Sequence, residues 1–205
     1  MNAHRRRFAY VALILVCTAV LAAALWRDRI AFELGYAYAQ GHFHGWTLAR
    51  DDARAATWLR RAAQAGHARA QYLLGLSYSR GWGVAQDDAQ AEHWFNQAAS
   101  QAYAPACYHL GWMAHKGEGV ARDAARAQRL MAQAAGLGMS AAGLALGRFH
   151  ELGEGAAKDA AAALHWYTLA ADSSRLHPDR FDNARFAARA VAARDRLRAQ
   201  SSGAP

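Results

Sequence analysis

The chain has 205 residues, of which 54% are hydrophobic, so it can bury a core of moderate size. Its formal net charge of +8 is concentrated at the ends: residues 1–29 carry +4 and residues 172–205 carry +3, against +1 for residues 30–171. A nucleic-acid-binding domain gathers its positive charge on one face, so this distribution argues against a nucleic-acid partner. The two cysteines, Cys17 and Cys107, are too few for a disulfide framework.

An uncharged segment, residues 8–26, follows three arginines near the N-terminus. As a helix rising about 1.5 Å per residue it would span roughly 28 Å, close to the hydrocarbon thickness of a membrane. Residues 1–29 are therefore predicted to be a signal anchor with one transmembrane helix. The arginines before it favour export of the rest of the chain. A cleaved signal peptide, ending near Ala22-Ala23-Ala24, is the alternative.

The middle of the chain repeats with a period of 36 residues. Three stretches align without gaps: "LGLSYSRGWGVAQDD" from Leu74, "LGWMAHKGEGVARDA" from Leu110 and "LGRFHELGEGAAKDA" from Leu146. Two further positions recur with the same period. One is an aspartate, at Asp51, Asp87, Asp123 and Asp159, and the other is a tryptophan in three of four copies, at Trp58, Trp94, Leu130 and Trp166. A fixed period of this length predicts a solenoid.

Each period predicts two helices. The first, called here the aspartate helix, starts after the aspartate, whose carboxylate can accept hydrogen bonds from free backbone N–H groups. The second, the glycine helix, contains Leu-Gly and ends at a Gly-x-Gly turn, where the left-handed conformation favours glycine. A glycine inside a helix costs about 1 kcal/mol relative to alanine. Its recurrence at Gly75, Gly111 and Gly147 therefore predicts a close helix crossing, which paired alanines on the aspartate helix would complete.

The stretch "WLRRAAQAGHARAQYLLGLSYSRGWGV", residues 58–84, resembles the Sel-1-like repeat (SLR) family, a relative of the tetratricopeptide repeats. The resemblance extends over roughly residues 30–171. It implies an all-α, right-handed α/α solenoid of tetratricopeptide-like helix pairs, here preceded by the transmembrane helix. "LGYAYAQG", residues 34–41, indicates that a glycine helix comes first. Residues 172–200 are expected to form a C-terminal capping region and residues 201–205 a disordered tail.

No motif in the sequence predicts catalysis, a cofactor, a nucleotide or a metal ion. A dinucleotide-binding fingerprint needs a preceding strand and three glycines, whereas Gly81-Trp82-Gly83 follows a helix and recurs, so it is interpreted as a turn. His42 and His44 are the closest histidine pair, but no further histidine or cysteine stands near them, which favours a polar loop. The chain is therefore predicted not to be an enzyme.

The resemblance implies protein–protein interaction, with the first helices of each unit lining the concave side. The polar residues that recur on the aspartate helices are the predicted partner-binding set: Arg54, Arg61, Gln90, His93, Gln97, Arg126, Arg129 and Gln133. An ordinary solvated helix face is the alternative. An arginine-rich helix from Pro178 to Gln200 is a second candidate, either as a cap of the solenoid or as a contact for anionic polymer or lipid headgroups.

These observations predict a membrane-anchored scaffold that binds protein partners. Arginine outnumbers lysine 22 to 2, which is typical of a GC-rich bacterial source. The expected location is the bacterial inner membrane, with a single membrane pass and the repeats in the periplasm, in an envelope assembly or signalling pathway. A secreted or periplasmic product of signal-peptide cleavage is the alternative location. An exported glycan-binding protein or envelope enzyme with a site built from scattered residues is the alternative function.

Overall fold

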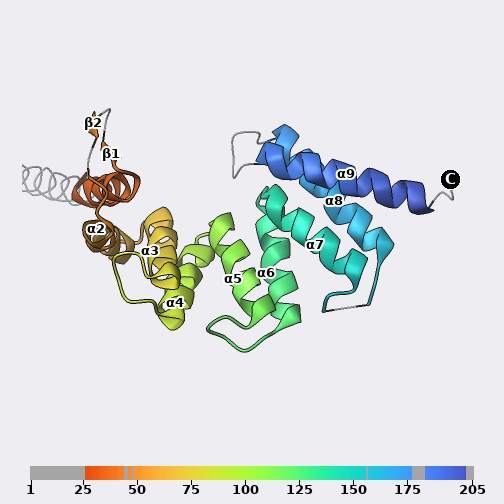
Figure 1. Cartoon of the computed structure of the whole chain (residues 1–205), viewed down its shortest axis with the longest axis horizontal. Helices are drawn as coiled ribbons and strands as arrows, with labels where there is room; N and C mark the ends of the chain where they lie inside the picture. Colours follow the sequence, from red (N-terminus) through yellow and green to blue (C-terminus); the bar gives the residue numbers. More distant parts are fainter. Residues whose placement is uncertain (1–25, 44–45, 48, 156, 177–182, 202–205) are drawn as a thin grey trace, which may run out of the picture.

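The computed structural model describes residues 26–43, 46–47, 49–155, 157–176 and 183–201, and their helices stack in one extended row (Figure 1). Residues 26–40 are helical, and a short hairpin of two strands follows. The remaining elements are helices of the two predicted kinds, in alternation. The bounds are β1 His42–Phe43, β2 Trp46–Thr47, α2 Asp52–Gln64, α3 Ala68–Arg80, α4 Asp88–Ser100, α5 Ala104–Lys116, α6 Ala124–Gly136, α7 Ser140–Leu152, α8 Ala160–Leu176 and α9 Asn183–Ser201.

Both ends of the repeated helices are formed as the sequence predicts. The carboxylates of Asp51, Asp87 and Asp123 each accept a hydrogen bond from the backbone N–H three residues later, at 2.8–2.9 Å. The glycine helices α3, α5 and α7 end at Gly81, Gly117 and Gly153, whose φ angles of 68°, 77° and 78° are left-handed. The aspartate caps therefore set where the aspartate helices begin, and the left-handed glycines set where the glycine helices end.

The predicted close crossing at the helical glycines is confirmed. A Cβ atom added to Gly75 would lie 2.7 Å from the Phe95 ring, and one added to Gly111 would lie 2.7 Å from Met131 Cγ. At Gly147 the added atom would overlap the ring of Tyr167, which is fully buried. The side chain that fills each crossing follows the tryptophan register position. The expected partner was the alanine pair four residues further on, so that detail of the prediction is wrong.

The second glycine of each Gly-x-Gly turn packs one repeat against another. Gly83, Gly119 and Gly155 have left-handed φ angles of 69°, 69° and 82°. A Cβ atom at Gly83 would collide with the backbone of Asp52, and one at Gly119 with the Asp88 side chain. The inner side of each turn thus contacts the first residues of the preceding aspartate helix. This contact gives the Gly-x-Gly stretch a structural role as a turn.

The first loop differs from the others because it is longer and contains strands. Phe43 pairs with Trp46 in an antiparallel register, so β1 and β2 form a small hairpin within an otherwise helical array. The backbone N–H of Asp51 still bonds to the Tyr38 carbonyl at 3.2 Å, as that of Asp87 bonds to Tyr78 at 3.0 Å. The extra residues are therefore accommodated in the hairpin, and the register of the repeats is kept.

At the C-terminal end α9 lies along α7 and α8 (Figure 1). It buries Ala187, Ala190 and Leu197, which agrees with a capping helix. Its predicted beginning at Pro178 lies outside the described residues, as does most of the predicted transmembrane segment. The helices of the described residues include none with the length and hydropathy of a membrane span. The predicted boundary at residue 29 falls inside the helix of residues 26–40.

Adding a methyl group at Gly147 tests the close crossing of α7 with α8. We expect Gly147→Ala to lower the free energy of unfolding by about 1–3 kcal/mol, because the added Cβ collides with a buried ring. Gly136→Ala is the matched control, since a Cβ there meets nothing within 4 Å. Urea unfolding followed by circular dichroism measures both. Equal stability of the two variants would contradict the crossing.

Candidate protein-binding groove

Two recesses run along the glycine helices and share the side chains of Tyr108 and Trp112. The α3–α5 recess has a volume of about 720 Å³, and Ser79 and Arg80 of α3 form one of its walls. The α5–α7 recess, of about 430 Å³, continues on the other side of the shared residues to Phe149. Because the same two aromatic side chains line both, we treat the recesses as one feature, the inner groove.

The inner groove is built from fixed positions of the repeat. In α5 and α7 the lining positions lie three residues before and one residue after the packed glycine, which places both on one side of the helix. In α5 these positions hold Tyr108 and Trp112, and in α7 they hold Leu144 and Arg148. The side chains that vary between repeats therefore face the groove, while the invariant glycine faces the next helix.

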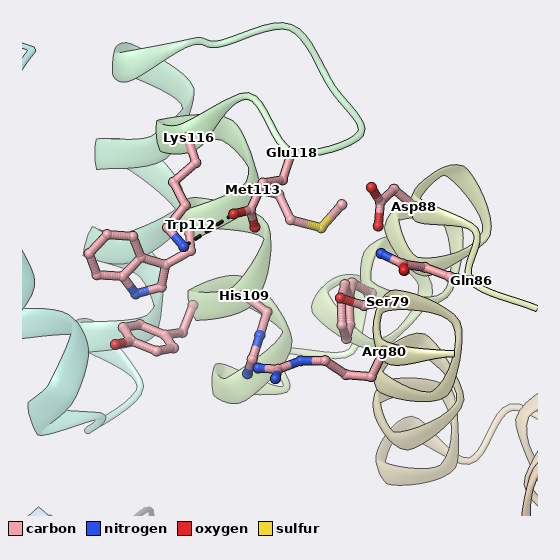
Figure 2. Close-up of a pocket in the computed structure, with 11 residues that line it drawn as sticks. Ser79, Arg80, Gln86, Asp88, His109, Trp112, Met113, Lys116 and Glu118 are labelled. Atoms are coloured by element: carbon pink, nitrogen blue, oxygen red, sulfur yellow. Dashed lines mark hydrogen bonds and ion pairs between the residues drawn. The ribbon is translucent and has the colours of Figure 1, made fainter. Parts of the chain in front are cut away.

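His109 lies at the bottom of the α3–α5 recess as a neutral imidazole. Its ring stacks on Phe95 with a centroid separation of 5.5 Å, and its Nε2 shares a hydrogen bond of 3.2 Å with the Tyr72 hydroxyl. Burial lowers the pKa of His109 to about 4, assisted by the positive charge of Arg80, which extends toward it in Figure 2. Burial also raises the pKa of Tyr72 to about 12, so this hydroxyl keeps its proton.

Acidic groups at the rim of the groove lie close to basic side chains. Lys116 Nζ contacts Glu118 at 3.2 Å, at the upper edge of the recess in Figure 2. His115 lies 3.6 Å from Glu154 and stacks on Phe149 at 4.4 Å. The groove therefore combines an aromatic floor with a polar rim, which is the composition of many protein-binding surfaces.

A family model for the Sel1 repeat matches residues 31–67, 68–103, 104–139 and 140–174. The chain belongs to the Sel1 repeat family. Each matched repeat starts with a glycine helix and ends with an aspartate helix. The sequence analysis paired the helices in the opposite order, with the aspartate helix first. No curated protein matched the chain.

Two solved structures show the same architecture. One is a protective antigen of uropathogenic Escherichia coli strains with an SLR fold: it is 34% identical, with a TM-score of 0.66, over 77% of this chain and 32% of its own. The other is a Sel1 repeat protein from Oxalobacter formigenes: it is 29% identical, with a TM-score of 0.64, over 72% of this chain and 57% of its own. This chain thus spans about a third and just over half of their lengths.

The eight predicted partner-binding residues lie outside the inner groove. They are on the Sel1 aspartate helices α2, α4 and α6, and all but Arg126 are exposed. Arg54 and Arg61 line a separate hollow of about 470 Å³ on α2, beside Trp58. The two recesses are lined mainly by residues of the glycine helices, and the expectation that the aspartate helices line the concave side stays a prediction. As a binding surface the eight residues stay a prediction.

Arg126 has a structural contact that the sequence analysis missed. Its guanidinium lies 2.6 Å from Glu92, which links α6 to α4, and both side chains are partly buried. Reversing the charge at Arg126 would place two carboxylates together and disturb the stacking of repeats. Arg129, which is exposed on the same helix, is therefore the better position to test this face.

The cysteine and histidine side chains were the remaining candidates for a catalytic or metal site. Cys107 is fully buried as a small core residue, and burial raises the pKa of its thiol. His93 and His165 are exposed beside the tryptophans. Among the described residues, no three histidine, cysteine, aspartate or glutamate side chains are placed to hold a metal ion. The side chains of His42 and His44 lie outside the described set.

The lowered pKa of His109, which is partly buried, predicts a pH dependence of stability. His109 is neutral in the folded Sel1 array down to about pH 4 but takes up a proton near pH 6.5 when unfolded. The unfolded state therefore binds more protons between these values, and stability present above pH 6.5 falls as the pH drops. We expect a loss on the order of 2 kcal/mol between pH 7 and pH 5 from this residue.

Urea unfolding at pH 7 and pH 5 measures this loss. His67, whose pKa burial also lowers and whose ring caps α3, should add to it in the same direction. His109→Gln should make stability less dependent on pH, whereas His93→Gln, at an exposed position, should leave the dependence unchanged. A pH dependence that is the same in all three proteins would show that His109 is not buried as described.

Proposed function

We propose that this Sel1 repeat protein is a membrane-anchored scaffold in the periplasm of a bacterium, where its inner groove binds protein partners of an envelope assembly. Sel1 repeats commonly mediate protein–protein interaction. The observation that carries the proposal here is that Tyr108 and Trp112 line both recesses, which provides a surface of half-buried aromatic side chains with polar groups around them. Such a surface suits an extended segment or a helix of another protein.

The location rests on the sequence of the N-terminal segment. Three arginines precede the uncharged residues 8–26, and this asymmetry favours a cytoplasmic N-terminus. The helix of residues 26–40 leads directly into the first repeat, so an anchor would hold the array close to the membrane surface. Bacterial origin of both similar structures, one of them a protective antigen, is compatible with an envelope role.

Reporter fusions test the topology. We expect alkaline phosphatase fused to the C-terminus to be active in a bacterial host, because it folds only after export, and a cytoplasmic fluorescent reporter at the same place to be dark. The opposite result would place the repeats in the cytoplasm and refute the periplasmic location. Mass spectrometry of the mature N-terminus distinguishes an anchor from a cleaved signal peptide.

Site-specific photo-cross-linking in cells tests the groove. A benzophenone amino acid in place of Tyr108 should form discrete adducts with protein partners, because this side chain lines both recesses. The same amino acid in place of Gln97, exposed on α4, is the matched position on the other face. Adducts from position 97 alone would show that partners bind the aspartate helices and not the inner groove. A lack of adducts from both positions would contradict the scaffold function.

A further inference from the structure

The face formed by α7 and α9 has two arginines between two hollows. The α5–α7 recess and a second hollow of about 760 Å³ share Leu144, Arg148 and Arg189. Arg148 comes from α7 and Arg189 from α9, and both side chains are exposed. Two guanidinium groups from different helices therefore lie between the two hollows and line both of them.

Neither guanidinium is engaged by a carboxylate among the described residues, although acidic groups are close. Glu151 already accepts a hydrogen bond from the Tyr167 hydroxyl at 2.6 Å and another from Arg196 at 2.5 Å. Glu154, at the other side, lies against His115 at 3.6 Å. Arg148, Arg189 and Arg196 line the two hollows together with the carboxylates of Glu151 and Glu154, so the arginines leave an excess of positive charge.

The floor beside these arginines is aromatic. Trp112 contacts Phe149 edge to face, with ring centroids 5.8 Å apart, and Tyr108 contacts Trp112 in the same way at 6.1 Å. Phe186 of α9 adds a third wall to the recess. Charge and apolar surface therefore adjoin within one depression, and a ligand that fits both must carry negative charge next to an apolar group.

We propose that this face, the arginine–aromatic site, binds an acidic segment of a protein partner, with a carboxylate at Arg148 and Arg189 and a neighbouring aromatic or aliphatic side chain in the α5–α7 recess. The proposal rests on the proposed function and adds the chemistry of the partner. Guanidinium groups bind carboxylates through paired hydrogen bonds in a fixed geometry, and a recess of about 430 Å³ suits side chains rather than a folded domain. A purely anionic polymer would leave the aromatic floor uncovered.

Selection from a phage-displayed library of random linear peptides tests this site, with the full chain in detergent micelles as the target. Selected peptides should be enriched in aspartate or glutamate next to aromatic or aliphatic residues. The double variant Arg148→Glu/Arg189→Glu should bind these peptides at least tenfold more weakly. The matched control is Arg54→Glu/Arg61→Glu, two exposed arginines beside another aromatic hollow, which should bind them unchanged. Arg148→Gln/Arg189→Gln replaces the first variant if circular dichroism shows it unfolded.

Several outcomes would overturn the proposal: peptides without acidic enrichment, unchanged binding by the Arg148/Arg189 variant, or equal loss in the control. Inorganic polyphosphate is the competitor without apolar groups. If it displaces the peptides as strongly as unlabelled peptide does, charge alone determines binding and the proposal is wrong. The scaffold function is judged separately, because adducts from position 108 would persist in the Arg148/Arg189 variant if partners bind the groove by other contacts.

Discussion

The repeated array depends on the contact between a glycine in one helix and a large side chain in the next. At Gly75, Gly111 and Gly147 the missing Cβ lets Phe95, Met131 or Tyr167 lie directly on the helix backbone. Each glycine weakens its own helix, yet the buried side chain recovers apolar burial that an alanine would prevent. Because the contact recurs every 36 residues, it sets the same spacing between helices along the whole row.

The Gly-x-Gly turns fix the packing between neighbouring repeats, as the helical glycines fix the packing between two helices. Gly83 and Gly119 carry left-handed backbone and approach the start of the preceding aspartate helix too closely for any side chain. The same aspartate helix is capped by its own Asp51 or Asp87, so its first turn is rigid where the glycine meets it. Helix spacing and turn packing together determine which side chains are left at the surface, and these form the inner groove.

Most of the fold, and less of the site, could be predicted from the sequence. Periodicity identified the helices, the aspartate caps and the glycine crossings because each depends on residues close together in the chain. The side that bears the groove could not be found in this way, since it depends on how α3, α5 and α7 stack in space. A signal was present: the positions of Trp112 and Arg148 vary between repeats while the adjacent glycine does not. The Arg126–Glu92 pair, 34 residues apart, was likewise invisible to a local pattern.

The C-terminal helix shows why capping and binding need not be alternatives. Ala187, Ala190 and Leu197 of α9 are buried, as the end of a solenoid requires. A helix turns by about 100° per residue, so residues beside this buried strip face another direction. Phe186 and Arg189 lie there, and they line the recess that α5 and α7 begin. The helix that closes the hydrophobic core thus also completes the last wall of the groove. Phe186 also packs against the core, whereas Arg189 is exposed, so the charge of that wall can change without loss of the buried contacts that hold the helix in place.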